Sequence, residues 1–582
     1  MRPFLKCSAL LLCFTVFWVA GAHARAQAQM KPESKHNAAI SHFEITGVVI
    51  SSIDGSPIPH CKLAASLEVR GRPGNRRLPA SADSYEADDR GRFSIPVSSA
   101  GAWNLKASAR GYVSQAYEEH GVFSSSIVLT AESPTIDIRF TVSPEASIKG
   151  FVLDEAGEPV RDAQVALQLV PTVTPGSPRV AGAARETART DDRGIYEFTD
   201  LPPGGYRLLA QAHPWYAEVS QNGSSATAVD PSLDFAYPLT WFPGNSDVAT
   251  AETIVLNAGD IRQADFHLVP IPSIHLKIAP APRAADASNG RQGEVFPIVE
   301  EVASGSLGPR PISLTTHRDA QGQFDISGLT PGLYQVRLSD GKSTMMNITA
   351  NSNPTLDFAA PQNDIAKVTI HIDAPAAVAE EFEGRPGTAL HVNLIDTDAQ
   401  RGTFSATGDE GGFAGRRFSR GAAAADHTLE VPPGRYEVVL QGGTNIYLVG
   451  LNAKGVEASG RYVTVPAGET ALTVHVGVGR AHVGGIATIE GKPAVAAMML
   501  LVPITIEDPD SIEFLRLDQT NTDGSFDVEN VIPGQYILVA IDRGWQIKWG
   551  DPLTLRHYLA QGVPMELKPS ATVKQNIVAQ AP

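Results

Sequence analysis

The chain has 582 residues, of which 43% are hydrophobic and 19% charged, and its formal net charge is −16. This length and apolar content allow several packed domains, and 52 glycines and 42 prolines are too few for a disordered low-complexity chain. The acidic balance disfavours nucleic acid and anionic membrane surfaces as partners, because both carry negative charge themselves.

The first residues predict an export signal. Arg2 and Lys6 give a positive start, Ala9 to Ala22 form an uncharged apolar run, and small residues between Ala22 and Ala28 offer cleavage sites. The apolar run is shorter than the roughly 20 residues of a membrane span. We therefore expect residues 1–28 to be a signal peptide. The mature chain is then exported, to the periplasm or the extracellular space, without a stable membrane anchor.

Cysteine usage is compatible with export. Cys7 and Cys13 lie in the signal segment, so the mature chain keeps only Cys61 and cannot form an intramolecular disulfide. We expect Cys61 to be a small buried hydrophobe, and stability to come from apolar cores and sheet hydrogen bonds.

A short pattern returns at intervals of about 100 to 130 residues, which is the size of one β-sandwich. It consists of an acidic turn with glycine, an aromatic residue, a Pro-Gly turn and a closing aromatic residue. The clearest copy runs from Asp191 to Tyr206. The closing aromatics are Trp103, Tyr206, Tyr334, Tyr436 and Tyr536. Apolar and polar residues alternate in runs such as Ile136 to Val142, as in strands with one buried face. The sequence predicts an all-β chain.

The residue types in this pattern favour a structural role. Aspartate accepts hydrogen bonds from backbone amides two residues on, and glycine adopts the left-handed conformation that the turn needs. The Pro-Gly turn then sends the closing aromatic residue into the core. Calcium binding at the acidic pairs Asp88-Asp89 and Asp191-Asp192 stays open as an alternative, although two carboxylates fall short of the six to eight oxygens that calcium takes.

The arrangement resembles the carboxypeptidase regulatory-like domain family, a transthyretin-like (prealbumin-like) sandwich related to collagen-adhesin B-type repeats. The resemblance rests on a glycine in the first strand, as in Gly150-Phe151-Val152, on the acidic turn, and on Leu201-Pro202-Pro203-Gly204-Gly205-Tyr206. It implies a tandem array of about five Greek-key β-sandwiches. The ranges, named modules 1 to 5 below, are 41–143, 144–271 with an aromatic loop insertion, 272–362, the divergent 363–477, and 478–582.

Catalytic patterns are weak. A zinc carboxypeptidase needs a His and a Glu three residues apart, and His427 and Glu430 have that spacing. They fall in an expected strand, where residues three apart point to opposite faces. We expect no catalytic residue, no metal and no cofactor, with a hydrolase as the weakest hypothesis.

The candidate ligand site lies where the repeats differ. Its residues are Trp215, Tyr216, Tyr237, Trp241 and Phe242 in module 2, with Trp545 and Trp549 as a second platform in module 5. Aromatic faces in a loop can stack on the apolar faces of sugar rings, with Asp234 or Asn245 to bond hydroxyl groups. Alternatively, these rings pin the loop onto the core of module 2.

The functional expectation is a non-enzymatic binding or scaffold protein of the cell envelope, with a polysaccharide as partner. A protein-interaction or adhesion scaffold, with an envelope protein as partner, is the alternative. An accessory role in a secreted peptidase system is a third one, drawn from the family resemblance.

Overall fold

The structure is a computed structural model. It describes residues 42–68, 83–170, 184–217, 233–247, 250–279, 296–301, 310–311, 314–318, 322–338, 343–358, 365–378, 390–397, 403–405, 427–443, 445–505, 514–547 and 551–582. The expected signal peptide, residues 1–28, lies outside these residues, and so does Trp549.

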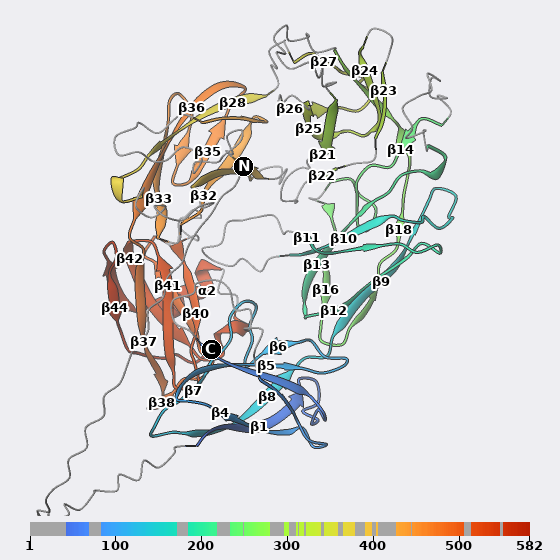
Figure 1. Cartoon of the computed structure of the whole chain (residues 1–582). Coiled ribbons are helices and arrows are strands. Elements are labelled where there is room, and N and C mark those ends of the chain that lie inside the picture. The colour runs from blue at the N-terminus through green and yellow to red at the C-terminus, as the bar shows by residue number, and fades with distance from the viewer. Residues whose placement is uncertain are drawn as a thin grey trace, which may run out of the picture. The chain divides into compact units, whose positions relative to one another are not determined.

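The described part is built from strands, as the alternating pattern predicts (Figure 1). The expected ranges each contain two main sheets. The division into five domains stays a prediction. No helix among the described residues has the length and apolar character needed to cross a membrane.

Module 1 has a sheet ordered β4-β1-β8 and a second ordered β3-β2-β5-β6, in which β7 also pairs with β5. Its strands are β1 (Phe43–Ser51), β2 (Lys62–Leu67), β3 (Asp83–Glu86), β4 (Arg92–Val97), β5 (Gly101–Ser108), β6 (Gln115–Ala116), β7 (Ile127–Leu129) and β8 (Thr135–Val142).

Module 2 has a sheet ordered β12-β9-β17, with β18 also on β9, and a second ordered β11-β10-β13-β15, with β16 also on β13. A small third sheet pairs β14 with β19. The elements are β9 (Ala146–Leu153), β10 (Gln164–Leu169), β11 (Ala184–Arg189), β12 (Ile195–Leu201), β13 (Gly204–Gln211), the 3-10 turn η1 (Trp215–Ala217), β14 (Phe235–Ala236), β15 (Thr240–Trp241), β16 (Ile254–Leu256), β17 (Ile261–Gln263), β18 (Phe266–His267) and β19 (Ile271–Pro272).

Module 3 has sheets ordered β23-β24-β20-β27 and β22-β21-β25-β26. Its strands are β20 (Ile274–Ile278), β21 (Pro297–Glu301), β22 (Arg310–Pro311), β23 (Thr315–Arg318), β24 (Phe324–Leu329), β25 (Gly332–Leu338), β26 (Ser343–Ile348) and β27 (Thr355–Leu356).

Module 4 has sheets ordered β31-β28-β36-β33 and β30-β29-β32-β35-β34. Its strands are β28 (Ala366–Asp373), β29 (His391–Asp396), β30 (Thr403–Ser405), β31 (His427–Val431), β32 (Gly434–Gln441), β33 (Ile446–Ala453), β34 (Ala458–Ser459), β35 (Tyr462–Val465) and β36 (Gly468–Val478).

Module 5 has a sheet ordered β38-β37-β41, with β44 and β45 also on β37, and a second ordered β40-β39-β42-β43. The elements are β37 (Ala481–Ile489), β38 (Lys492–Pro493), β39 (Met498–Pro503), β40 (Arg516–Gln519), β41 (Ser525–Val531), β42 (Gly534–Ile541), the 3-10 turn η4 (Gly544–Gln546), α2 (Pro552–Leu559), β43 (Val563–Leu567), β44 (Thr572–Lys574) and β45 (Ile577–Val578).

One strand arrangement recurs in all five ranges. The first strand pairs in antiparallel fashion with a later strand and in parallel with one near the end of the range, as β1 does with β4 and β8. The parallel partners of β9, β20, β28 and β37 are β17, β27, β36 and β44. The same pairing of the first strand therefore accompanies the repeated sequence pattern in each expected range.

The closing aromatic residues lie in the cores, as predicted, and they also close the turn before them. In each module the side chain donates a hydrogen bond to the carbonyl oxygen four residues earlier. The bonds are Trp103 Nε1 to Ser99 O at 3.1 Å, Tyr206 Oη to Pro202 O at 2.7 Å, Tyr334 Oη to Thr330 O at 2.8 Å, Tyr436 Oη to Pro432 O at 2.6 Å and Tyr536 Oη to Ile532 O at 2.6 Å. One residue thus fills the core and satisfies a turn carbonyl.

The acidic turns cap themselves. Asp88 Oδ1 accepts the amides of Arg90 and Arg92, both at 2.8 Å, and Asp191 Oδ1 accepts those of Arg193 and Ile195 in the same way. These backbone bonds hold the pKa of both carboxyl groups below the ordinary value. The capping prediction is confirmed. Cys61 is fully buried and free, also as predicted.

Candidate functional site

Two of the predicted ligand-binding aromatics are core residues. Trp241 is only 2% exposed and pairs across the sheet with Leu209, with which it forms a small apolar cluster that includes Ala166. Tyr237 is buried in the main core of module 2. The prediction that these two rings stack on a ligand is wrong for this structure, because neither face is open to solvent.

Phe242 and Trp545 are half-buried and have aromatic partners of their own. Phe242 contacts the ring of Phe266 edge-on, with centroids 5.9 Å apart, and packs against the core of module 2. Trp545 of η4 stacks on His120 of module 1 with centroids 5.3 Å apart and 5° between the planes, and it also contacts Phe123. In the predicted second platform, the ring of Trp545 is therefore already in contact with His120 and Phe123 of the same chain.

Trp215 differs from the others, because its side chain is 73% exposed. It begins η1, which follows β13 after residues 212–214, and meets Tyr216 edge-on with ring centroids 5.7 Å apart and 83° between the planes. Tyr216 in turn meets Phe235 of β14 edge-on at 6.5 Å. The exposed indole thus stands at the end of a short row of rings, of which Phe235 could not be identified from the sequence.

A carboxylate fixes the base of this row. Glu155, in the turn after β9, accepts hydrogen bonds from Tyr216 Oη and Tyr237 Oη, one on each oxygen and both at 2.8 Å. Burial acts to raise the pKa of Glu155, but hydrogen bonds from its own amide and the two tyrosines outweigh it and hold the pKa below the ordinary value. We call Trp215, Tyr216, Phe235 and Glu155 the Trp215 site.

The two polar groups expected to bond sugar hydroxyls are already engaged. Asn245 donates through Nδ2 to the carbonyl of Thr250 at 3.2 Å. Asp234 directly precedes Phe235 of the Trp215 site, and its carboxylate faces His275 of module 3. Asp234 is therefore part of the junction between modules 2 and 3.

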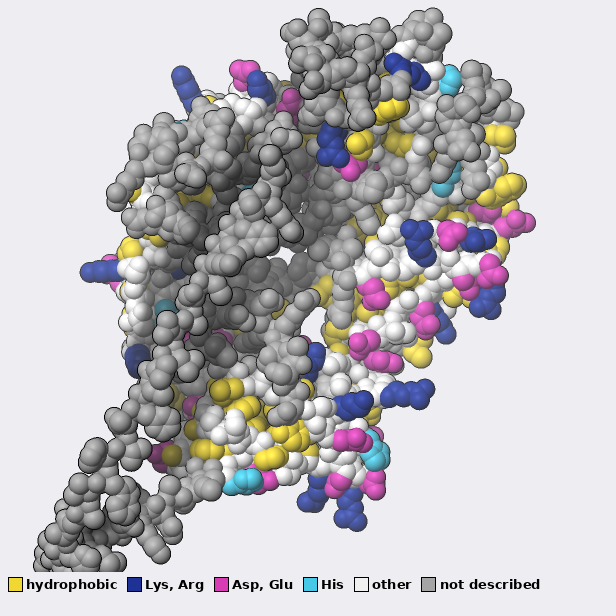
Figure 2. Space-filling view, in the orientation of Figure 1, with side chains coloured by type: hydrophobic (Ala, Val, Ile, Leu, Met, Phe, Trp, Pro, Cys, Tyr) yellow, Lys and Arg dark blue, Asp and Glu magenta, His cyan; other side chains and the backbone are white. Residues whose placement is uncertain are grey.

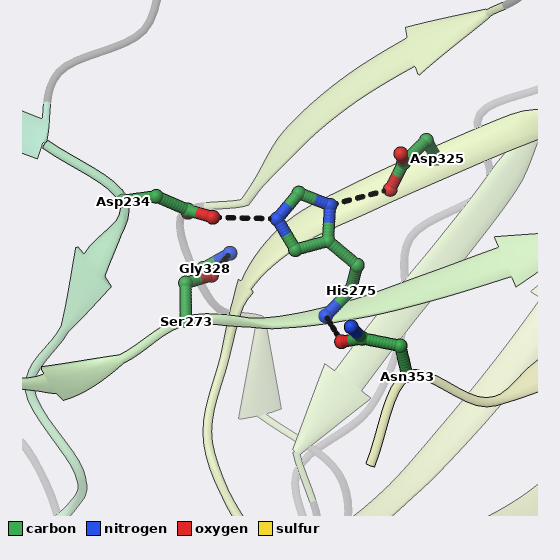
Figure 3. A network of polar contacts seen from close by, with 6 residues as sticks. All are labelled: Asp234, Ser273, His275, Asp325, Gly328 and Asn353. Carbon is green, nitrogen blue, oxygen red and sulfur yellow. Dashed lines mark hydrogen bonds and ion pairs between the residues drawn. The ribbon is translucent and has the colours of Figure 1, made fainter. Parts of the chain in front are cut away.

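Figure 3 shows this junction, with the imidazole of His275 held between two carboxylates. Its Nε2 lies 2.6 Å from Asp234 Oδ2, and its Nδ1 lies 2.8 Å from Asp325 Oδ1 on β24. Each ring nitrogen can donate to a carboxylate only if it carries a proton, so the geometry selects the imidazolium cation. Asn353 fixes the backbone of the same residue by accepting its amide at 3.0 Å.

The junction continues along the backbone. The amide of Ser273 donates to the carbonyl of Asp234 at 2.9 Å, and Ser273 Oγ accepts the amide of Gly328 (Figure 3). β14 and β19 pair beside it, with Phe235 opposite Pro272. The strand that carries Phe235 is thus tied to module 3 by the ion pair and by backbone bonds.

We expect this junction to weaken at high pH. Burial acts to lower the pKa of His275, but hydrogen bonds and charges from Asp234 and Asp325 outweigh it and raise the pKa above its ordinary value near 6.5. The stabilisation is therefore complete below about pH 6.5 and is lost as the pH rises through the raised pKa. The other titratable groups on the neighbouring strands are Lys277 and His317, whose backbones lie opposite Asp325, and Arg318 of β23.

The measurement is hydrogen exchange at the Ser273 amide, corrected for intrinsic exchange, between about pH 6 and pH 9. Protection should fall roughly tenfold in the native chain, because one charge-assisted hydrogen bond worth about 1.5 kcal/mol is lost. In His275→Gln, protection should be low at all pH values. The same pH profile in both proteins would show that His275 does not control the junction.

The surface in Figure 2 shows no segregation of charge. On that face, acidic and basic side chains of the described residues are interspersed. Among the described residues, no three or more His, Cys, Asp or Glu side chains gather as they would to hold a metal ion. His427 and Glu430 lie on the strand β31, as expected.

The comparisons with known proteins identify part of the chain. Residues 147–269, which make up most of module 2 and include the Trp215 site, match the family model of the carboxypeptidase regulatory-like domain. This is the family that the repeated pattern resembles. No curated protein matches the sequence.

Solved structures with similarity to the chain include the following three. The Bacillus anthracis TIE protein is 14% identical with a TM-score of 0.16, over 55% of this chain and 50% of its own. The chain thus spans about half the length of that protein. GBS52, the minor pilin of Streptococcus agalactiae, is 9% identical with a TM-score of 0.20, over 42% of this chain and 99% of its own. BcpA, the major pilin subunit of Bacillus cereus, is 6% identical with a TM-score of 0.14, over 92% of this chain and 99% of its own.

Proposed function

We propose that the chain is an exported, non-enzymatic binding protein of the cell envelope, and that it binds an envelope polysaccharide through Trp215. The observation that carries the proposal is the exposed indole of Trp215, which meets the ring of Tyr216 edge-on at the surface of module 2.

The surroundings of Trp215 are ordered before any ligand binds. An aromatic ring exposed to water gains free energy when a ligand covers its face. The affinity is highest when the conformation of the ring is already fixed, because less conformational entropy is then lost on binding. Tyr216 is tied to Glu155, and Glu155 is tied to the buried Tyr237, so the neighbour of Trp215 cannot move freely. The indole therefore rests against a fixed ring and exposes an apolar face, the kind of surface that the apolar side of a sugar ring stacks on.

A protein partner is the second candidate, since tryptophan is also common at the centre of protein interfaces. Protease digestion distinguishes a polysaccharide ligand from a protein ligand. Isolated envelope polysaccharide that has been digested with a protease keeps a sugar ligand and loses a protein ligand. Retained binding of the native chain after this digestion supports the polysaccharide.

We expect Trp215→Ala to weaken binding to protease-treated envelope polysaccharide roughly thirtyfold, because a central tryptophan in an interface is worth about 2 kcal/mol or more. Sedimentation of the polysaccharide with bound protein, over a range of protein concentrations, measures the affinity.

The matched control is Val255→Ala, which removes another exposed apolar side chain from module 2 and should leave the affinity unchanged. Trp241 is unsuitable as a test residue, because its substitution disturbs a buried cluster. Equal affinity of native chain and Trp215→Ala, or no binding by the native chain, would rule out the proposal.

A further inference from the structure

Module 1 and module 5 are joined by hydrogen bonds between segments about 395 residues apart in the sequence. The amide of Ser126 donates to Asn521 Oδ1 at 2.8 Å, and the amide of Val128 donates to Thr522 Oγ1 at 2.8 Å. In the other direction, the amide of Thr522 donates to the carbonyl of Ser126 at 3.1 Å. We call residues 118–128 and 519–522, with Trp545, the clasp.

The turn that supplies Asn521 and Thr522 differs from the corresponding turns of modules 1 and 2. The turn Asn521 to Ser525 is closed by the same backbone bonds as the turns that begin at Asp88 and Asp191. Those two aspartates use their carboxylates to accept amides of their own turn. Module 5 has Asn521 at that position, and its side-chain oxygen accepts an amide of module 1 instead. In module 5 the side-chain oxygen at this position therefore binds another module and not its own turn.

Buried polar side chains complete the contact. Gln519 is 3% exposed, and its Nε2 donates to the carbonyl of Glu118 at 2.6 Å and to Ser125 Oγ at 2.9 Å. Ser125 Oγ donates to the carbonyl of Thr520 at 2.7 Å, with both residues buried. Buried polar groups without partners are costly. Gln519 and Ser125 find their partners across the contact, so their polar groups are satisfied in the interior only while modules 1 and 5 stay together.

The clasp also covers a sheet edge. β7 pairs with β5 on one side, and the amide of Val128 and the carbonyl of Ser126 on the other side are taken by Thr522. An uncovered strand edge would present unpaired backbone groups to other chains. Stacking of Trp545 on His120 adds an aromatic contact beside this edge.

We propose that module 5 is the binding partner of the β7 edge of module 1, and that the clasp ties the two ends of the array together within one chain. This inference does not depend on the ligand of Trp215. It implies that modules 1 and 5 separate only when the polar contacts of the clasp are broken.

The test substitutes residues of module 5 and measures amide hydrogen exchange in module 1 of the full chain. In the double variant Asn521→Ala and Thr522→Ala, the amides of Ser126 and Val128 should exchange at least about tenfold faster than in the native chain. Each lost hydrogen bond contributes about 1 kcal/mol of net stabilisation, and local opening becomes easier by that amount. Unchanged exchange in β41, next to the altered turn, shows that module 5 stays folded.

Two further proteins make the result specific. Gln519→Ala should accelerate the same amides of module 1 while leaving the turn itself intact. Asp192→Ala, at the position of module 2 that corresponds to Thr522, should change nothing in module 1.

Unchanged exchange at Ser126 and Val128 in both clasp variants would overturn the proposal. Native-chain protection that falls on dilution would also overturn it, because a contact within one chain does not depend on protein concentration.

Discussion

Replacement of Gly150 by alanine should unfold module 2. A Cβ atom at this position would lie 1.7 Å from the carbonyl oxygen of Ala264, a backbone atom that cannot swing aside as a side chain does. The same oxygen accepts the hydroxyl of the buried Tyr196 at 2.5 Å. We expect a loss of about 3 to 5 kcal/mol in the free energy of unfolding, more than the roughly 1 to 3 kcal/mol that overpacking usually costs, because the clash is with the backbone.

The site of Gly150 explains why the first-strand glycine belongs to the repeated pattern. β9 pairs in parallel with β17 and then with β18, and Ala264 lies between these two strands. In module 5 the corresponding Gly485 faces Gln575 between β44 and β45, where a Cβ would come within 1.9 Å of the carbonyl oxygen. Only glycine leaves room for the backbone at these points.

Segment-resolved hydrogen exchange of the full chain measures the free energy of opening of β9 and β12 in Gly150→Ala. The control is Gly450→Ala in β33, where a Cβ would meet no atom within 4 Å, and which should change stability by less than about 0.5 kcal/mol. Equal protection of module 2 in the native chain and in Gly150→Ala would show that the backbone approach is not as close as the structure places it.

The second large effect is expected at a buried ion pair in module 4. Glu437 of β32 is fully buried, and its carboxylate is paired with the guanidinium of Arg461, which is 9% exposed. Arg461→Ala removes a charge partner and leaves a carboxylate in the interior. Breaking a buried pair in this way costs about 3 to 5 kcal/mol.

Chemical denaturation followed by hydrogen exchange in β32 and β35 measures this loss. Arg435→Ala is the matched control, because Arg435 is exposed and its guanidinium lies 4.7 Å from the ring centroid of Tyr462, the neighbour of Arg461. Its loss should cost less than about 1 kcal/mol. Replacing both partners, as in Glu437→Leu with Arg461→Met, should be milder than Arg461→Ala alone. The reverse order would contradict the account of this pair.

The sequence predicts the sandwich well because the signals are local. Turn capping by Asp191 involves residues at most four apart, and strand alternation, as in β8, depends on a period of two. The burial of Tyr206 follows from the same short pattern. No residue type signals its hydrogen bond to Pro202, because the acceptor is a backbone carbonyl and the residue four positions earlier differs between modules, as in Thr330 and Ile532.

The sequence predicts the site less well because exposure is not local. Trp215 and Trp241 both lie in the same insertion, yet one is exposed and the other is buried against Leu209. The contacts of Asp234 with His275, and of Trp545 with His120, join different modules. No periodicity in one strand indicates such pairs, since they depend on how finished modules meet.

The comparison of the five copies locates what is specific to this chain. The shared residues cap turns and fill cores, and the differing residues carry the contacts proposed to matter. Asn521 replaces a capping aspartate and reaches module 1, and Trp215 follows β13 as an exposed ring. The proposed function therefore depends on residues outside the repeated pattern.

Hydroxyl-radical footprinting of the full chain, with and without protease-treated envelope polysaccharide, tests the central claim most directly. Side-chain oxidation reports solvent exposure residue by residue, so it shows where a ligand lies. We expect the polysaccharide to protect Trp215, with a smaller effect on Tyr216 and no change at the buried Trp241. Protection elsewhere on the bound chain, with Trp215 oxidised as fast as in the free protein, would contradict it.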